Sequence, residues 1–307
     1  MKFNFIEGFM LILIALLVGV IVFILIEKNT KKKALRDFAS TLEEGGRTIY
    51  VDGIRLFIRE AGEGSVPLLM IHGFLESSDN FQSNINELSK LRKVIAIDLP
   101  GFANSDKDIK IDYSREHLAL LLDRMMNQLG YDTYDLLGHS LGGEIALHIT
   151  INHPSSINSL ILVDAAGYQS NQHRSLPPWL VENIFLSYPM QKYLLKLSLY
   201  NKDIWNKDVF MKAYAYNAQI PGASFMKFSR DNRNADLTAT IKNIKVPVLI
   251  LWGAEDRLIP VSDAERFHQD ISNSEMEIFT HCGHLPFVEY PDRFNKSVAE
   301  FLRKNTR

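Results

Sequence analysis

The chain has 307 residues, with 34 lysines and arginines against 36 aspartates and glutamates. This near balance of charge excludes the broad positive field that nucleic-acid binding needs, and the sequence has no glycine-rich loop of the kind that cradles phosphates. The one cysteine excludes an intramolecular disulfide.

An apolar run is the first predicted element. It extends from Phe9 to Ile26 after a short tail of residues 1–8, and neither charge nor proline interrupts it. About 18 residues at about 1.5 Å each roughly match the thickness of a bilayer core. A signal peptide would have a shorter apolar region and a small-residue cleavage site. The run therefore predicts a transmembrane anchor.

Positive charge follows this run rather than preceding it. Only Lys2 comes before it, whereas the linker, residues 27–46, carries a basic cluster of Lys28, Lys31, Lys32, Lys33 and Arg36. By the positive-inside rule we expect a single-pass membrane protein whose remaining chain is cytoplasmic. In the same linker, apolar residues from Leu35 to Leu42 recur at helical spacing, so this stretch lies either on anionic lipid or on the domain.

From Arg47 onward, apolar strands alternate with helices, which predicts a mostly parallel sheet with helices on both faces. The first two strands, Arg47 to Val51 and Ile54 to Glu60, are expected to form an antiparallel hairpin around Asp52-Gly53. A buried strand then ends at His72-Gly73-Phe74. A helix from Ser114 to Leu129 fits one of the crossovers.

Ser140 lies at the centre of Gly138-His139-Ser140-Leu141-Gly142, between an apolar strand and a helical run that begins at Gly143. This Gly-x-Ser-x-Gly pattern is typical of a nucleophile elbow, in which a strand turns sharply into a helix. Larger neighbours would collide with the strand or the helix, so small residues flank the serine. The pattern predicts that the Ser140 hydroxyl is an exposed nucleophile.

A serine hydroxyl is a weak nucleophile at neutral pH, so it needs a base and a carboxylate that orients the base. Two later segments supply them in the order serine, acid, histidine. The strand from Val246 to Gly253 is followed by Glu255-Asp256-Arg257, and His281-Cys282-Gly283-His284 lies near the C-terminus. We assign Ser140 as nucleophile, His284 as base and then acid, and Asp256 as orienting acid.

These motifs resemble the α/β-hydrolase superfamily from about Arg47 to the end of the chain. Membrane-anchored monoacylglycerol lipases and related bacterial lipases are most similar, through Trp252-Gly253-x-x-Asp256 and Cys282-Gly283-His284. The resemblance implies an oxyanion hole formed by the backbone N–H groups of Phe74 and Leu141. It also implies a second glycine where this chain has Ala103, a departure that affects the shape of that loop.

Other residues compete for these roles. Asp164 follows another apolar strand, where some hydrolases of this fold recruit their acid, although Asp256 has the fuller match. Glu255 is adjacent to Asp256, and His281 precedes His284 by three positions. His139 lies inside the elbow and is interpreted as a packing or loop residue. No His-Glu-x-x-His segment or other metal-ligand spacing occurs.

Between Gly167 and Ile241 the alternation stops, and a segment rich in aromatic and methionine residues follows. By its position it is predicted to be the helical lid that the superfamily inserts after the sixth strand. Its apolar side chains either bind an acyl chain or form the core of the lid itself. They are Trp179, Phe185, Tyr188, Met190, Tyr193, Tyr200, Trp205, Phe210, Met211, Tyr214, Tyr216, Phe225, Met226 and Phe228.

The sequence thus predicts an α/β-hydrolase fold with its core at residues 47–167 and 241–307, a lid at 168–240, and an N-terminal transmembrane helix. The expected function is a membrane-anchored serine hydrolase that cleaves esters of lipophilic substrates, such as monoacylglycerols, through an acyl-enzyme, without a cofactor or metal. One alternative is a carbon–carbon bond hydrolase of ring-fission products with the same triad. The other is a catalytically slow, membrane-tethered binding module.

Overall fold

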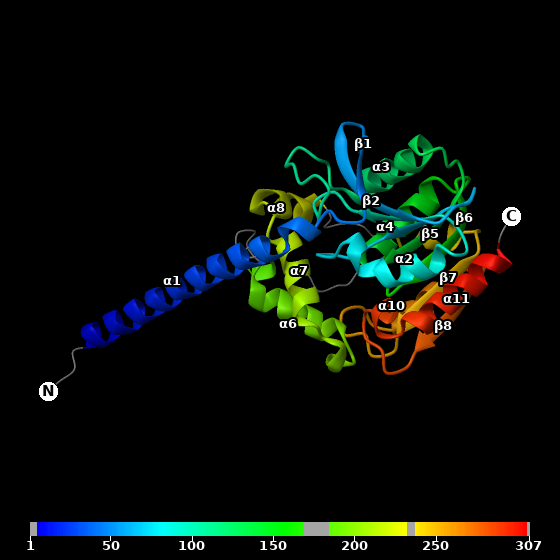
Figure 1. Cartoon of the computed structure of the whole chain (residues 1–307). Coiled ribbons are helices and arrows are strands. Elements are labelled where there is room, and N and C mark those ends of the chain that lie inside the picture. Colours follow the sequence, from blue (N-terminus) through cyan, green and yellow to red (C-terminus); the bar gives the residue numbers. More distant parts are fainter. Residues whose placement is uncertain (1–4, 169–183, 232–236, 306–307) are drawn as a thin grey trace.

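A sheet of eight strands forms the centre of the protein, and helices cover both of its faces (Figure 1). The computed structural model describes residues 5–168, 184–231 and 237–305, with the side chains of 5–13 and 16 left out. The strand order is β1-β2-β4-β3-β5-β6-β7-β8. β2 pairs antiparallel with β1 and β4, whereas all other neighbours are parallel. The predicted hairpin and the mostly parallel sheet are both confirmed.

The elements follow one another along the chain as predicted for an alternating fold. The strands are β1 (Arg47–Val51), β2 (Ile54–Ala61), β3 (Leu68–Ile71), β4 (Val94–Asp98), β5 (Tyr134–His139), β6 (Ile157–Val163), β7 (Val248–Gly253) and β8 (Ser274–Phe279). The α-helices are α1 (Phe5–Phe38), α2 (Gln82–Leu88), α3 (Arg115–Gln128), α4 (Leu141–Asn152), α6 (Tyr188–Ser198), α7 (Lys207–Asn217), α8 (Gly222–Asp231), α9 (Ser262–Asp270), α10 (Pro286–Glu289) and α11 (Pro291–Lys304). Short 3₁₀ helices are η1 (Ala39–Thr41), η2 (Ser78–Phe81), η3 (Lys202–Ile204) and η4 (Ile241–Asn243).

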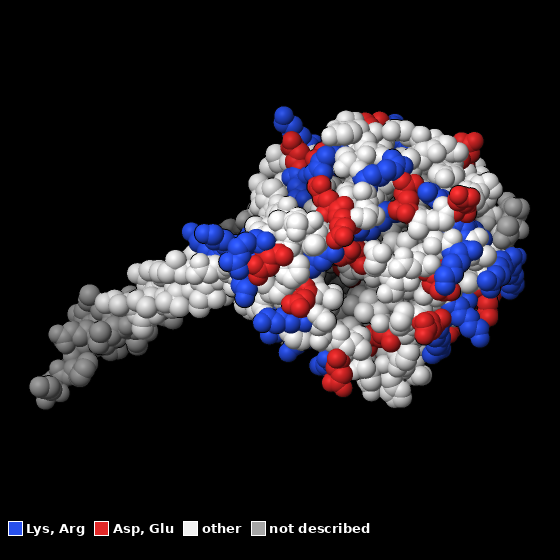
Figure 2. Space-filling model, in the orientation of Figure 1, with Lys and Arg blue, Asp and Glu red and all other residues white. Residues whose placement is uncertain are grey.

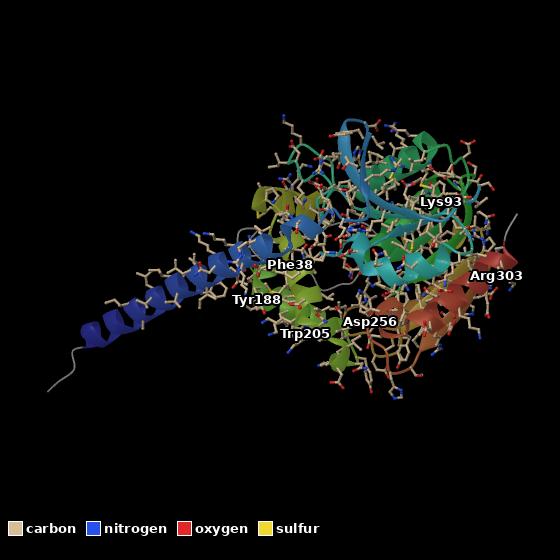
Figure 3. All side chains as sticks on the ribbon, viewed as in Figure 1. Phe38, Lys93, Tyr188, Trp205, Asp256 and Arg303 are labelled. Carbon is tan, nitrogen blue, oxygen red and sulfur yellow. The ribbon has the colours of Figure 1, made fainter. Side chains whose placement is uncertain are left out.

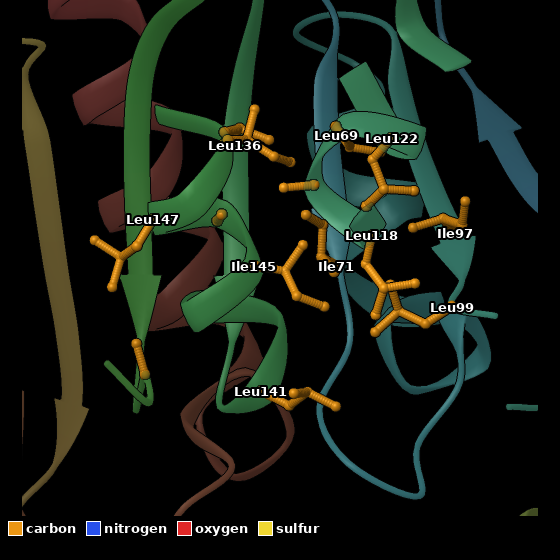
Figure 4. Packing of buried hydrophobic residues seen from close by; sticks show 14 of the residues in the cluster. Leu69, Ile71, Ile97, Leu99, Leu118, Leu122, Leu136, Leu141, Ile145 and Leu147 are labelled. Carbon is orange, nitrogen blue, oxygen red and sulfur yellow. The ribbon is translucent and has the colours of Figure 1, made fainter. Parts of the chain in front are cut away.

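The inner strands β3 to β7 are buried on both faces, because successive side chains point to opposite sides of the sheet and helices cover both sides. In β3, Leu69 and Ile71 face the cluster that includes α3 and α4 (Figure 4). Leu68 and Met70 face the other cluster, which includes residues of α2 and α11. Each fully buried aliphatic side chain contributes about 1.5–3 kcal/mol. This packing fixes the sheet and brings the carboxyl ends of its parallel strands to one edge.

The prediction of a membrane-spanning anchor at Phe9 to Ile26, with the rest of the chain cytoplasmic, is wrong. Within the residues that the structure describes, no helix is both long enough and apolar enough to cross a bilayer. A helix does form there, but α1 continues without a break through the predicted linker (Figure 1). Its described apolar stretch ends at Glu27, and that carboxylate accepts hydrogen bonds from the Tyr188 N–H at 2.9 Å and from the Tyr214 hydroxyl.

The carboxyl half of α1 packs against the protein. Ala34 and Leu42 are buried with Phe210 and Tyr214 of α7, and Phe38 packs against the same cluster. Lysine and arginine side chains gather where the helix meets the body, while the described part of the helix that projects beyond them shows no charged side chain (Figure 2). Of the two alternatives for the linker, packing on the domain is confirmed.

Gly253, the last residue of β7, lies where the edge of the sheet is tightly packed. A Cβ on Gly253 would lie 1.8 Å from the Gly283 carbonyl oxygen, a backbone atom that has no room to move away. We therefore expect Gly253→Ala to destabilise the protein by about 3 kcal/mol or more in urea unfolding.

Gly130→Ala is the matched control. Gly130 has φ +89 but no atom within 4 Å of the added Cβ, so only the backbone cost of about 1–2 kcal/mol applies. Equal losses in the two variants would show that the contact with Gly283 is not tight.

Candidate active site

Ser140 occupies a strained turn between β5 and α4. Its φ of 52° and ψ of −117° lie outside the regions that ordinary residues adopt. A Cβ on Gly138 would lie 2.4 Å from the Gly142 carbonyl oxygen, and one on Gly142 would lie 2.2 Å from that of Ile71. The turn therefore requires glycine at both positions, and it leaves Ser140 lining a pocket.

The structure brings the three predicted triad residues to the same edge of the sheet. His284 and Ser140 line one pocket. The His284 Nδ1 atom lies 2.6 Å from the Asp256 Oδ2 atom, and the Asp256 side chain is fully buried. This contact fixes the orientation of the imidazole ring, which leaves its Nε2 atom available for proton transfer.

The two predicted oxyanion residues follow β3 and β5, which are neighbours in the sheet. Phe74 lines the pocket. Leu141 is the first residue of α4, so its N–H is among the donors that a helix leaves without an intrahelical partner. The positive end of the helix dipole adds to this donor, and such a site favours a developing negative charge.

The competing residues take other positions. Glu255 accepts a hydrogen bond from the Cys282 N–H at 2.9 Å and so joins the acid loop to the histidine loop. His281 is exposed, outside the lining of the pocket. Asp164 is fully buried beside the pair, and one ligand atom from each of Asp164, Asp256 and His284 lies within 4.8 Å of the others. Such a cluster could ligate a cation, but in this structure His284 Nδ1 and Asp256 Oδ2 form a hydrogen bond with each other.

Sequence reasoning missed Glu76, which lies in the pocket next to the predicted oxyanion loop. Its Oε2 atom accepts a hydrogen bond from the Gly73 N–H at 2.9 Å and lies 3.0 Å from Nδ1 of His139. The other ring nitrogen of His139 donates to the His284 carbonyl oxygen at 2.9 Å. His139 is thus more than a packing residue, since it joins the elbow to two neighbouring loops. A carboxylate three residues after the His72-Gly73 turn was the available signal.

The Glu76–His139 pair is charged. Burial opposes the charge on Glu76, but the nearby His139 and the Gly73 N–H outweigh it and lower the pKa of Glu76 to about 2. Burial likewise opposes the charge on His139, but the Glu76 carboxylate outweighs it and raises the pKa of His139. The Glu76 carboxylate of this pair lies in the wall of the pocket, with its charge balanced by His139.

The pocket over Ser140 has a volume of about 480 Å³, which is in the usual range for a small-molecule site. Helices α6 and α7 supply much of its wall, together with Phe74, Phe185 and Leu285. Its polar lining consists of hydroxyl and amide groups and one carboxylate, Glu76. Among its described lining residues, His284 is the one basic side chain.

The aromatic residues between β6 and β7 divide into two groups. Phe185, Phe210 and Tyr216 line the pocket. Tyr188, Trp205 and Tyr214 instead pack around Phe210, in the cluster that also holds Ala34 of α1; Tyr188 and Trp205 are labelled in Figure 3. Phe225 and Phe228 pack on Phe74. Trp179 lies outside the described residues. Some of these side chains therefore form a core of the segment itself, as one interpretation expected, whereas acyl binding by those that line the pocket and the role of the segment as a lid stay predictions.

The chain is similar to known hydrolases in sequence and in fold. A family model for the alpha/beta hydrolase fold matches residues 66–291. The 2-hydroxymuconate semialdehyde hydrolase of Pseudomonas sp. (strain CF600) is 30% identical over 271 residues, which cover 84% of this chain and 94% of that protein. The solved meta-cleavage product hydrolase of Pseudomonas fluorescens IP01 has a TM-score of 0.76 at 25% identity, over 87% of this chain and 100% of that one. A membrane phospholipase A, described as a bacterial virulence factor, has a TM-score of 0.73 at 26% identity over 98% of both chains.

The Glu76–His139 pair predicts a pH-dependent loss of stability in Glu76→Gln. The contribution of Glu76 is present above its ordinary pKa of 4.5 and disappears as the pH falls towards 2. That of His139 is complete below its ordinary pKa of 6.5 and disappears as the pH rises through the raised value. We expect a loss of about 3 kcal/mol or more between these two ordinary values and a smaller loss at pH 9.

Urea unfolding at pH 5.5 and pH 9 checks this expectation. Glu63→Gln is the control, because Glu63 is exposed and should show no such pH dependence. A loss in Glu76→Gln that is the same at both pH values would contradict the expectation that His139 gives up its proton between pH 5.5 and pH 9.

Proposed function

The chain belongs to the α/β-hydrolase family, and from that premise we propose that it is a serine hydrolase that cleaves carboxylic esters of uncharged, lipophilic substrates. The observation that carries the proposal is the pocket around Ser140. Its described lining is mostly apolar, includes neither lysine nor arginine, and includes the ionised Glu76. Such a pocket favours an acyl chain and disfavours a substrate carboxylate.

The proposed reaction begins when the Ser140 Oγ attacks the ester carbonyl carbon and His284 Nε2 takes the hydroxyl proton. The negative charge on the former carbonyl oxygen is stabilised by the N–H groups of Phe74 and Leu141. Asp256 holds the imidazole ring and stabilises the imidazolium that forms. As the carbon–oxygen bond to the alcohol breaks, His284 returns the proton to the alcohol oxygen, which leaves an acyl-enzyme on Ser140.

The second half of the proposed reaction repeats these steps with water. His284 removes a proton from the water as its oxygen attacks the acyl carbon, and the same two N–H groups stabilise the second oxyanion. Collapse of this intermediate breaks the bond to Ser140, whose oxygen regains the proton from His284. The products are a carboxylic acid and an alcohol.

The solved relatives support an acyl substrate in part. The one that extends over nearly the whole chain is titled a phospholipase A, a name that denotes cleavage of a fatty acyl ester. In the proposed binding mode, the acyl chain lies along Phe210 and Ala213 of α7 and Leu194 and Leu195 of α6, which line the pocket. Burying each CH₂ group there is worth about 0.8 kcal/mol.

Carbon–carbon bond hydrolysis is the second candidate, because curated relatives are named as hydrolases of ring-fission products, such as the 2-hydroxymuconate semialdehyde hydrolase. Names of this kind denote acidic substrates, and one relative is named for a hexa-2,4-dienoic acid. A buried carboxylate needs a paired cation. The described lining of the pocket offers none besides His284, so the ester reading is the better supported one.

The proposal predicts that Ser140→Ala lowers kcat/KM by at least about a thousand-fold, because the nucleophile is lost. The measurement is hydrolysis of p-nitrophenyl esters from acetate to palmitate and of monoacylglycerols by the full chain, with a 2-hydroxy-6-oxo-dienoate as the carbon–carbon substrate.

Ser155→Ala, at an exposed serine after α4, is the matched control and should keep full activity. Labelling of the wild type by a fluorophosphonate, and its loss in Ser140→Ala, separates an active serine from a silent binding module. Serine-dependent turnover of the dienoate alone would refute the ester proposal in favour of the second candidate.

The acyl-binding wall can be tested with Ala213→Trp, which should shift the preferred ester towards acetate by filling the pocket and cost about tenfold or more on long chains. Val209→Trp on the same helix is the control, because Val209 is 68% exposed outside the pocket. An unchanged chain-length profile in Ala213→Trp would place the acyl chain elsewhere.

A further inference from the structure

Asp164 lies directly after β6, in contact with the proposed triad but outside it. The side chain is fully buried, and its φ of 42° is one that a non-glycine residue rarely adopts. Its Oδ1 atom accepts a hydrogen bond from the Gly253 N–H at 3.0 Å. Among the described residues, its Oδ2 atom has no hydrogen-bond partner. One carboxylate oxygen of Asp164 lies within 4.8 Å of an oxygen of Asp256 and of a ring nitrogen of His284.

The hydrogen bonds divide unevenly between the two carboxyl groups. Asp256 Oδ1 accepts from the N–H groups of Leu258 at 2.7 Å and Ile259 at 3.1 Å, and Oδ2 faces His284 Nδ1 at 2.6 Å. Asp256 thus has the donors that a carboxylate needs, whereas Asp164 has one. Two buried negative charges this close are strongly unfavourable, so the pair keeps one proton.

We infer that Asp164 is a neutral carboxylic acid whose O–H donates to Asp256, which makes it a positioning residue for the triad of the proposed function. A protonated carboxyl has one donor to give, and Asp256 is the acceptor beside the Oδ2 atom that otherwise lacks a partner. The proton stays on Asp164 throughout the reaction. The bond holds the plane of the Asp256 carboxylate towards His284 without adding a second charge.

The groups around Asp164 agree with this protonation state. Burial is the largest influence and raises the pKa of Asp164 well above its usual range, and the charge on Asp256 raises it further. The Gly253 N–H opposes these effects, while Glu289 of α10 adds to them. Among the described residues, the other titratable neighbours are His284 and the buried Cys282 thiol, whose own pKa is raised by burial and by the charge of Glu289.

The neutral state has a purpose in the proposed mechanism. A second carboxylate at this distance would stabilise the His284 imidazolium and hold the base in its protonated form. A neutral donor instead orients Asp256 and leaves one negative charge to balance one developing positive charge. This account rests on the proposed function, but the protonation state can be tested apart from it.

The test compares Asp164→Asn, which keeps a neutral donor of the same shape, with Asp164→Ala, which removes the donor. We expect Asp164→Asn to stay within about threefold of the wild type in kcat/KM and to keep the same acid-side midpoint of the pH–rate profile. We expect Asp164→Ala to lower kcat by about tenfold with KM unchanged. The rate of fluorophosphonate labelling of Ser140 should follow kcat in both variants.

Two results would overturn the inference. A loss of about 10⁴-fold in Asp164→Asn would make Asp164 a charged orienting acid. A fall of about two pH units in the acid-side midpoint would mean that the substitution removed a charge from the neighbourhood of His284.

A measurement without turnover separates this inference from the proposed function. The ¹³C resonance of the Asp164 carboxyl, assigned by its absence from Asp164→Asn, should remain that of a protonated acid at pH 7. If Asp164→Asn does not fold, Asp164→Ser provides the assignment. A resonance of the ionised form would refute the inference even if esters are hydrolysed, and a protonated acid would uphold it even if they are not.

Discussion

The close approach of backbone to backbone at the carboxyl edge of the sheet is the constraint on which the rest of the structure depends. The turn at Ser140 exists because Gly142 lies against Ile71, and the histidine loop reaches the sheet because Gly253 lies against Gly283. At each contact a single methyl group would overlap a carbonyl oxygen. Glycine therefore does more than permit a backbone angle here, since it sets how near three loops come to one another and hence the geometry of the proposed triad.

The close approach of these loops also determines which groups at this edge of the sheet are charged. Groups that would be solvated on an open surface are buried together, so each charge needs a partner or must be lost. Glu76 has His139, and Asp256 has His284 with two backbone donors. Asp164 has no such set of donors, and neutrality resolves the conflict. The site thus combines the charged Glu76–His139 pair, which joins neighbouring loops, with a carboxyl group that acts without charge.

The segment between β6 and β7 connects this site to α1. Asn217 at the end of α7 donates to the Leu75 carbonyl oxygen, next to the proposed oxyanion residue, and to Gln191 of α6. On the other side of α7, the Tyr216 hydroxyl donates to the Leu42 carbonyl oxygen at 2.6 Å. The wall of the pocket is therefore held between the oxyanion loop and the chain that follows α1. Substrate selection in the proposed function depends on this arrangement as much as on the triad.

The sequence by itself determined the alternating fold, the hairpin at Asp52-Gly53 and the elbow at Ser140, because these depend on local patterns: period-two apolar strands, turn residues and small neighbours. It also gave the order of the triad candidates. The tertiary structure alone decided that Glu76 and His139 form a pair, that Asp164 lies against Asp256, and that the linker of α1 packs on α7. Hydropathy measures how apolar a segment such as Phe9 to Ile26 is, but it does not show what a segment packs against. Packing depends on residues that are distant in the chain, so only the tertiary structure decides it.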